Sequence, residues 1–238
     1  MAQVYPLKEY YVRYLREIKG LKNSSVNHYV DAINFISKYL CELQVISYSL
    51  FCVNDVEVLN KYRLMLKADE KFVQIDERGH RMYSAGLNNY YKFACGDFFE
   101  HDIQSIKALD IKLPPAERQT ETVVKYTRDS IIKKQVLRYA KYKCEIDGSH
   151  NTFTAKSNNE PYMEGHHAIP MKEQGVFENS LDVYANVVCL CPICHRLMHY
   201  GIDSEKKLLI DKIYYDRSER LANSGIILSY DEFYQLSK

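Results

Sequence analysis

The stretch that decides the fold is NVVCLCPICHRLMHYG, residues 186–201, which holds three cysteines and two histidines in sixteen positions. Cys191 and Cys194 form a C-x2-C knuckle, which presents two thiolates to one tetrahedral zinc ion. His195 and His199 are one helical turn apart, so both imidazoles project from the same helix face and can hold a second metal. The adjacent residues Cys194 and His195 are therefore predicted to serve two different metal sites.

A closed structural zinc site needs two ligands besides the knuckle. Upstream, Cys144 begins the stretch CEIDGSH and is the obvious third ligand. Asp147 stands at the C-x2 spacing from Cys144 and His150 at C-x5, so both are candidates for the fourth. Zinc in a cysteine-rich site prefers nitrogen to a lone carboxylate, which favours His150. We predict a structural Zn²⁺ held by Cys144, His150, Cys191 and Cys194.

Two further histidines lie in EGHHAIP, residues 164–170. His166 and His167 are consecutive in a strand-like run, so their side chains point to opposite faces. One can bind the metal held by the helical pair, while the other faces the substrate and is free to take a proton. Asn186 is placed to form hydrogen bonds across the loop that carries His167. A base that activates water and a cation that stabilises charge are what phosphodiester hydrolysis requires.

From Cys144 to Gly201 these motifs resemble an HNH (ββα-metal) endonuclease domain, in the cysteine-containing branch shared with many bacterial restriction endonucleases. The pattern HH-x18-N-x8-H-x3-H is similar in its second half to that of colicin-type DNases. The resemblance implies that His167 is the general base and that Asn186 orients it. It implies a catalytic divalent cation (Mg²⁺, Mn²⁺ or Ni²⁺) on His166, His195 and His199. Glu164 matches an acidic residue that supports the site, for instance by holding an arginine.

The chain departs from that family at its first knuckle, where the usual C-x2-C is C-x2-D, which leaves the identity of the fourth zinc ligand open between Asp147 and His150. Nitrogen-rich ligation at the second site favours a transition metal over Mg²⁺, which prefers oxygen. Cys41, Cys52 and Cys95 stand in apolar, helical contexts and are expected to be buried thiols.

Length and composition indicate a globular protein of two modest domains: 238 residues, 46% hydrophobic and 26% charged. No apolar run approaches the roughly 20 residues that span a bilayer, and the start lacks the apolar region of a signal peptide. Clustered Cys and His residues favour metal over disulfides, as in a reducing compartment. We expect a cytoplasmic protein with no membrane partner.

A net charge of +1 gives no global indication of a nucleic-acid partner. Locally, residues 125–143 carry seven basic side chains and the single acidic Asp129, although a solvated helix face looks similar. If DNA is the partner, the residues expected to contact its phosphates are Arg128, Lys133, Lys134, Arg138 and Arg196.

The expected fold is α+β and mainly helical. A helical N-terminal domain spans residues 1–112, a linker with two prolines spans 113–120, and residues 121–238 form the zinc-stapled ββα-metal domain with a basic helix and a C-terminal helix. The expected N-terminal helices run from Pro6 to Gly20 and from caps at Ser24 or Ser25, Asn54 or Asp55, and Ser84, with the polar DERGHR as a turn. The layout of these helices is loosely similar to that of the SAM-like domains with which tyrosine recombinases bind DNA. The stretches that carry this similarity are SSVNHYVDAINFISKYL, early in the domain, and YSAGLNNYYKFA, late in it. Partner binding is the alternative role for this domain.

The hypothesis is a metal-dependent endonuclease that hydrolyses DNA, in restriction or defence against foreign DNA, as a homodimer if it cuts both strands. The alternatives are a zinc-stapled DNA-binding module without catalysis, an RNA-directed nuclease, and a purely interacting protein. Only the nuclease hypotheses give His167 a use, so divalent-dependent cleavage separates them from the others.

Overall fold

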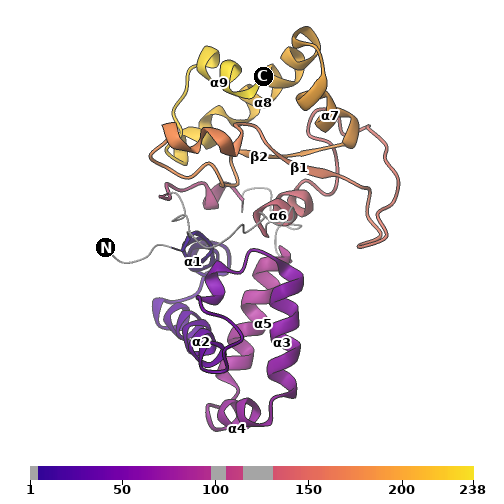
Figure 1. Ribbon diagram of the computed structural model, residues 1–238. Coiled ribbons are helices and arrows are strands. Elements are labelled where there is room, and N and C mark those ends of the chain that lie inside the picture. The colour runs from indigo at the N-terminus through magenta and orange to yellow at the C-terminus, as the bar shows by residue number, and fades with distance from the viewer. Residues whose placement is uncertain (1–4, 98–105, 115–130) are drawn as a thin grey trace. The chain divides into compact units, whose positions relative to one another are not determined.

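A computed structural model describes residues 5–97, 106–114 and 131–238 of the chain (Figure 1). The fold is α+β and mainly helical, and the chain divides into two compact units. Of the described residues, 5–97 lie in the first unit, while 106–114 and 132–238 lie in the second. Arg128, most of the expected linker and residues 125–130 of the basic stretch lie outside the described residues. Within the described ranges, no helix has both the length and the apolar character needed to cross a membrane.

The first unit is a helical bundle. Its elements are α1 (Pro6–Arg13), a π-helical turn (Tyr14–Ile18), α2 (Asn23–Glu42), a 3₁₀ turn (Leu50–Cys52), α3 (Val56–Ala68), α4 (Glu70–Arg78) and α5 (Met82–Cys95). Pro6 begins α1, and Asp55 caps α3 by accepting hydrogen bonds from two backbone N–H groups. The centre of this unit is aromatic, with rings of α1, the π-helical turn, the 3₁₀ turn and α5 in mutual contact, namely Tyr11, Tyr14, Phe51, Tyr90 and Phe93.

Two expected helix starts are wrong. Helix α2 begins at Asn23 without a side-chain cap, so neither Ser24 nor Ser25 caps it. Helix α5 begins at Met82 rather than after Ser84, because Asp76 of the preceding helix accepts hydrogen bonds from the backbone N–H groups of residues 83 and 84, both at 3.0 Å. Asp76, six residues before the start of α5, thus takes the capping role that was expected of Ser84.

Helix α4 was not expected from the sequence, although Asp69 caps it by accepting hydrogen bonds from the backbone N–H groups of Lys71 and Phe72. The expectation of buried thiols in this unit is also wrong: Cys41 and Cys52 are exposed and Cys95 is half-buried. Helical periodicity placed these cysteines beside apolar residues but did not determine which face is covered.

The second unit contains a small sheet with helices around it. In chain order the elements are a 3₁₀ turn (Lys107–Leu109), α6 (Ile131–Tyr139), β1 (Glu164–His167), a 3₁₀ helix (Met171–Val176), β2 (Val187–Leu190), α7 (Pro192–Tyr200), α8 (Asp203–Asn223) and α9 (Tyr230–Ser237). Strands β1 and β2 are antiparallel, with Glu164 opposite Leu190 and His167 opposite Val187. This register brings the EGHH motif alongside the run that leads into the knuckle.

Two arginines of α8 fasten that helix to the rest of the second unit. Arg217 donates to the carboxylate of Glu145, whose other oxygen accepts a hydrogen bond from the Cys189 backbone N–H at 2.7 Å. Arg220 binds both oxygens of the buried Asp110, at 2.6 and 3.0 Å. These paired charges hold the segment after Cys144 and the short 106–114 segment against α8.

Candidate functional site

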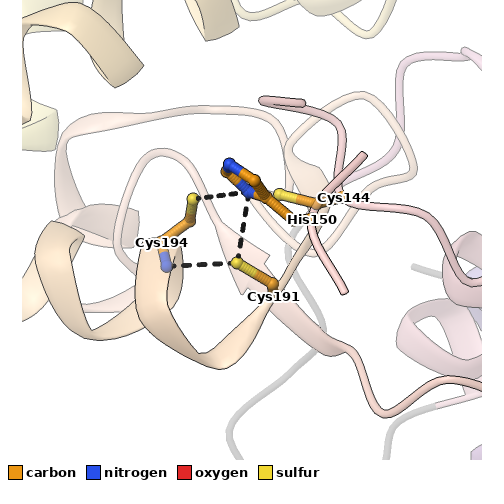
Figure 2. Close-up of side chains that lie close together, drawn as sticks. All are labelled: Cys144, His150, Cys191 and Cys194. Atoms are coloured by element: carbon orange, nitrogen blue, oxygen red, sulfur yellow. Dashed lines mark hydrogen bonds between the residues drawn. The ribbon is translucent and has the colours of Figure 1, made fainter. Parts of the chain in front are cut away.

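The knuckle residues gather as the spacing predicts (Figure 2). One candidate ligand atom from each of Cys144, His150, Cys191 and Cys194 lies within 4.8 Å of the others. His150 Nδ1 lies 3.4 Å from Cys191 Sγ and 3.5 Å from Cys194 Sγ. Three thiols and one imidazole around a common centre fit a closed tetrahedral zinc site.

Asp147 lies behind His150 rather than among the sulfur atoms. Its Oδ1 accepts hydrogen bonds from the Ser149 backbone N–H at 2.8 Å and from the Ser149 hydroxyl at 2.7 Å. Its Oδ2 lies 3.9 Å from His150 Nε2, on the side of the ring away from the thiols. The geometry favours His150 as the fourth ligand, because its Nδ1 faces the thiols whereas Asp147 is hydrogen-bonded to Ser149.

The environment of Cys144 favours its thiolate. Burial opposes ionisation, but backbone N–H groups of Cys191, Asp147 and Ile146 and the His150 ring outweigh it and lower the pKa of Cys144 to about 7. Burial and the neighbouring sulfur atoms raise the pKa of Cys194. A bound cation removes that penalty, because a thiol that coordinates metal is deprotonated.

The second cluster consists of His166 from β1 and His195 and His199 from α7. One ring nitrogen of each lies within 4.8 Å of the others, and His195 Nε2 and His199 Nε2 are 3.1 Å apart. Burial, reinforced by the other histidines, lowers the pKa of His166 to about 3, and burial also lowers that of His199. His166 and His199 are therefore neutral near pH 7, the form in which imidazole binds a cation.

Glu164 supports this cluster through a histidine rather than through an arginine. Its Oε2 is hydrogen-bonded to His195 Nδ1, which leaves His195 Nε2 directed at the cluster. Its Oε1 accepts a hydrogen bond from the Tyr162 hydroxyl at 2.9 Å. Burial opposes ionisation, but these two bonds lower the pKa of Glu164. A carboxylate behind a ligating histidine fixes the tautomer and the ring orientation.

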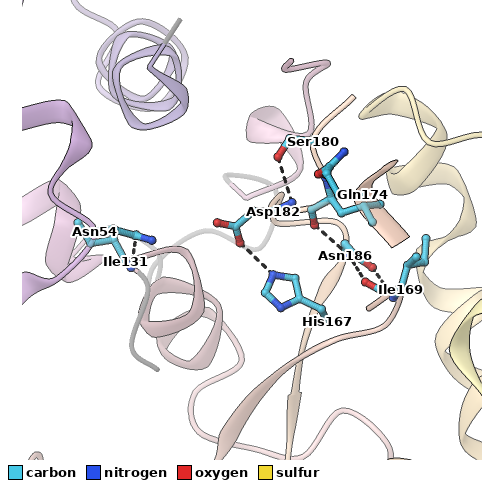
Figure 3. A network of polar contacts seen from close by, with 9 residues as sticks. Asn54, Ile131, His167, Ile169, Gln174, Ser180, Asp182 and Asn186 are labelled. Carbon is cyan, nitrogen blue, oxygen red and sulfur yellow. Dashed lines mark hydrogen bonds and ion pairs between the residues drawn. The ribbon is translucent and has the colours of Figure 1, made fainter. Parts of the chain in front are cut away.

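His167 is paired with a carboxylate that the sequence analysis missed. His167 Nε2 lies 2.9 Å from Asp182 Oδ1, and the imidazole is largely buried (Figure 3). Asp182 itself lies in a loop whose backbone is held by polar side chains, with its N–H donating to Ser180 Oγ at 3.1 Å and the Leu181 N–H donating to Gln174 Oε1 at 2.8 Å. Asp182 stands in the stretch SLDVYAN without any motif around it, so only its position in the fold identifies it.

Asn186 is fully buried, and its hydrogen bonds go to the backbone around His167 rather than to the His167 ring. Its side chain accepts a hydrogen bond from Ile169 N–H at 2.8 Å and donates to the carbonyls of Ile169 and Leu181, both at 2.9 Å. Its backbone carbonyl accepts from Ala168 N–H at 2.8 Å. Asn186 therefore fastens the residues that follow His167 to the loop that carries Asp182, and Figure 3 shows it between them.

Most of the basic residues expected to contact DNA lie in the second unit. Helix α6 places Lys133 against β1, so closely that a Cβ on Gly165 would lie 3.0 Å from the Lys133 Cβ. Lys134 and Arg138 are partly exposed on the same helix, and Arg196 is exposed on α7, with its guanidinium 5.9 Å from the centre of the Tyr200 ring. The four described basic residues of the expected DNA contact are thus in the unit that holds both clusters.

Comparison with known proteins assigns the region around both clusters. Residues 144–201 match the family model for the HNH endonuclease. This segment is an HNH endonuclease domain. The HNH domain includes all seven residues of the two clusters and also Glu164, His167, Asp182 and Asn186.

A curated relative points to the same branch of the family. The chain is 37% identical over 89 residues to the type IV methyl-directed restriction enzyme EcoKMcrA of Escherichia coli (strain K12). The match covers 37% of this chain and 29% of that enzyme. The chain therefore spans under a third of the length of the relative, and the similarity applies to a domain rather than to the whole protein.

Proposed function

We propose that this protein is a metal-dependent endonuclease that hydrolyses phosphodiester bonds in DNA. The observation that carries the proposal is the convergence of three imidazoles on one point, beside a fourth, His167, that is paired with a carboxylate and left out of the cluster. A domain that only bound DNA would have no use for a histidine paired with a carboxylate beside the cluster. The name of the relative supports a role in restriction of foreign DNA.

The residues of the second cluster fit a divalent cation. His166, His195 and His199 would each offer one neutral nitrogen, and a nitrogen-rich set of this kind suits Mn²⁺, Ni²⁺ or a related transition ion better than Mg²⁺. Once bound, the cation would supply positive charge that stabilises the phosphate as negative charge builds up on it. Glu164 would keep His195 in the tautomer that presents Nε2.

His167 would act as the general base. Its Nε2 is engaged by Asp182 at 2.9 Å, which requires the proton to be on Nε2 and leaves the lone pair on Nδ1. Nδ1 would take the proton from the attacking water, and Asp182 would stabilise the positive charge that the ring then gains. The water oxygen would form the new bond to phosphorus as the bond to the 3′ oxygen breaks, and the departing 3′ oxygen would take a proton from solvent, so the products would carry a 5′-phosphate and a 3′-hydroxyl.

The remaining residues would position these groups or the substrate. Asn186 would keep His167 and Asp182 in fixed positions relative to each other, because its hydrogen bonds join the segments that carry them. Lys133, Lys134, Arg138 and Arg196 would neutralise backbone phosphates, a contribution that depends on salt but not on base sequence. Base recognition would then fall to other parts of the chain, and the helical first unit is the candidate.

The direct test is cleavage of supercoiled plasmid across a series of divalent ions. The proposal expects nicked or linear product only with a divalent ion, and a His167→Ala variant that retains DNA binding but no longer cuts. Unchanged cutting by His167→Ala would refute the assigned base. Binding without any cutting across the whole metal series would instead favour the DNA-binding module.

A second set of substrates tests the restriction setting. Methylated DNA, unmethylated DNA and RNA of the same sequence should be compared with the best metal ion. Preference for one of the DNA forms would support restriction, whereas faster cleavage of RNA would make the protein an RNA nuclease.

A further inference from the structure

The segment just before β1 is a protruding hairpin with an exposed aromatic ring. Residues 151–163 fold back on themselves, with Thr154 bridged to Pro161, Ala155 N–H donating to Glu160 O at 2.8 Å and Tyr162 N–H donating to Phe153 O at 2.9 Å. Most of these residues are exposed. In Figure 1 the hairpin leaves the start of β1 and projects from the helices of the second unit.

Phe153 and Tyr162 form a flat aromatic stack on this hairpin. Their ring centroids are 4.8 Å apart and their planes differ by 16°. Phe153 is nevertheless 64% exposed. Since Tyr162 covers only one face of the Phe153 ring, the opposite face is open to solvent. A cross-strand pair of this kind stabilises a hairpin, but stabilisation alone does not require a phenyl face to be left in water.

The stack is connected to the second metal cluster by two hydrogen bonds. The Tyr162 hydroxyl donates to Glu164 Oε1 at 2.9 Å, and the other oxygen of Glu164 is bonded to His195. The orientation of the Phe153 ring is therefore set, through three successive contacts, by the same residues that orient a ligand of the catalytic cation. A group that lay against Phe153 would be held at a fixed place relative to that cation.

We propose that Phe153, backed by Tyr162, is a stacking platform for an unstacked nucleobase of the strand being cut. This inference rests on the proposed nuclease function. An open, flat ring of fixed orientation matches the π-face that every nucleobase presents, so the contact would be tolerant of sequence. The hairpin tip carries Lys156 and the amides of Asn158 and Asn159, groups that suit the neighbouring phosphates.

An unstacked base is more available in some substrates than in others. Taking a base out of a perfect duplex costs a few kcal/mol, and the cost is lowest for a mismatched or single-stranded base. The platform therefore predicts tighter binding, or faster cutting, where the duplex is mismatched or gapped beside the scissile phosphate. A fully paired duplex of the same length is the reference.

The absence of tryptophan from the chain makes a direct test possible. Phe153→Trp creates a single tryptophan at the proposed platform, and Tyr215→Trp creates one at a position on α8 that is 77% exposed in the same unit. Both are made in the full-length His167→Ala background, so that DNA is bound but not cut. Emission is followed while a single-stranded or mismatched oligonucleotide is added, and binding is measured independently by the anisotropy of labelled DNA.

We expect DNA to quench the tryptophan at position 153 and to leave the one at 215 unchanged. Unchanged emission at 153 when anisotropy shows saturation would overturn the platform while leaving the nuclease proposal intact. Equal quenching at both positions, or quenching by the perfect duplex alone, would also overturn it. Failure of every oligonucleotide to bind would remove the nuclease proposal and this inference together.

Two substitutions separate stacking from a structural role. Phe153→Ala should weaken binding of the mismatched oligonucleotide by about 5- to 150-fold, the range seen when a base-stacking aromatic is truncated. Phe153→Tyr should restore binding, whereas Phe153→Leu, which keeps an apolar side chain without a π-face, should not. If Phe153→Leu binds as tightly as the parent protein at unchanged melting temperature, the ring is not a platform.

Discussion

Replacement of Asp182 by asparagine tests the pairing that the sequence did not reveal. Asp182→Asn keeps the size of the side chain and a carbonyl oxygen that can still accept from His167 Nε2, but it removes the negative charge. A hydrogen bond to a charged partner is stronger than a neutral one, and contributes about 1.5–3 kcal/mol. The variant should therefore hold His167 in place and yet stabilise its protonated form less well.

The structure sets where in that range the effect should lie. Asp182 and His167 are 2.9 Å apart, which is a full hydrogen bond, but the Asp182 side chain is 32% exposed and solvent screens part of its charge. Because the neutral hydrogen bond that remains still contributes about 0.5–1.5 kcal/mol, the expected loss is the difference at the low end of both ranges, about 1 kcal/mol. At about 1.4 kcal/mol for each factor of ten, kcat should fall by roughly 5-fold.

The assay is single-turnover cleavage of plasmid with enzyme in excess and the divalent ion saturating, so that chemistry rather than product release is measured. Substrate affinity and melting temperature should stay close to those of the parent protein. The matched control is Asp216→Asn, which removes an equally sized carboxylate from a surface pair with Lys212 at 3.4 Å. Cleavage by Asp182→Asn at the parental rate would refute the role of Asp182, as would an equal loss in Asp216→Asn.

Three further changes test the clusters and the frame around them. Cys144→Ser should lower the zinc content measured by mass spectrometry and the melting temperature, because the binding energy of a structural site is also folding energy; Cys41→Ser, at an exposed thiol, should change neither. Glu164→Ala should weaken Mn²⁺ or Ni²⁺ binding, followed by titration calorimetry, by about 10- to 100-fold through loss of its bond to His195. Arg220→Met should lower the free energy of unfolding, measured in urea, by about 3 kcal/mol, which is the lower end for breaking a buried ion pair. The lower end is expected because burial already raises the pKa of Asp110, so that its carboxylate is more easily protonated once Arg220 is gone.

Each of these three predictions can be contradicted by a specific result. A zinc-replete and stable Cys144→Ser protein would place the structural site elsewhere. Glu160→Ala is the matched control for Glu164, since it removes an exposed carboxylate four positions away; equal losses in the two would indicate a general charge effect. A cost below about 1 kcal/mol in Arg220→Met would show that Asp110 is satisfied without its arginine.

The clusters were predictable because their ligands are chemically distinctive and regularly spaced. A C-x2-C knuckle and histidines one helical turn apart specify local geometry on their own, and the predicted strand positions of residues 164–167 supplied the remaining histidine. His150 was favoured over Asp147 from ligand preference alone, and the position of Asp147 behind the ring agrees with that choice.

What escaped prediction depends on contacts between segments distant in sequence. Asp182 becomes the partner of His167 only because Asn186 and Gln174 fold its loop toward β1, and no periodicity signals such a contact. The start of α5 was misplaced for a similar reason, since its cap is supplied by Asp76 from the preceding helix rather than by the local Ser84. Local patterns gave the elements and the ligands, whereas the supporting polar contacts were set by tertiary structure.

The start of helix α7 implies an order of assembly. Cys191 is the N-cap of α7, with its sulfur accepting a hydrogen bond from Cys194 N–H at 3.4 Å. On the proposed ligand assignment the same sulfur atom is a zinc ligand, so zinc would fix the first turn of the helix that carries His195 and His199. A newly made chain would then acquire its scaffold ion before it could hold the catalytic one.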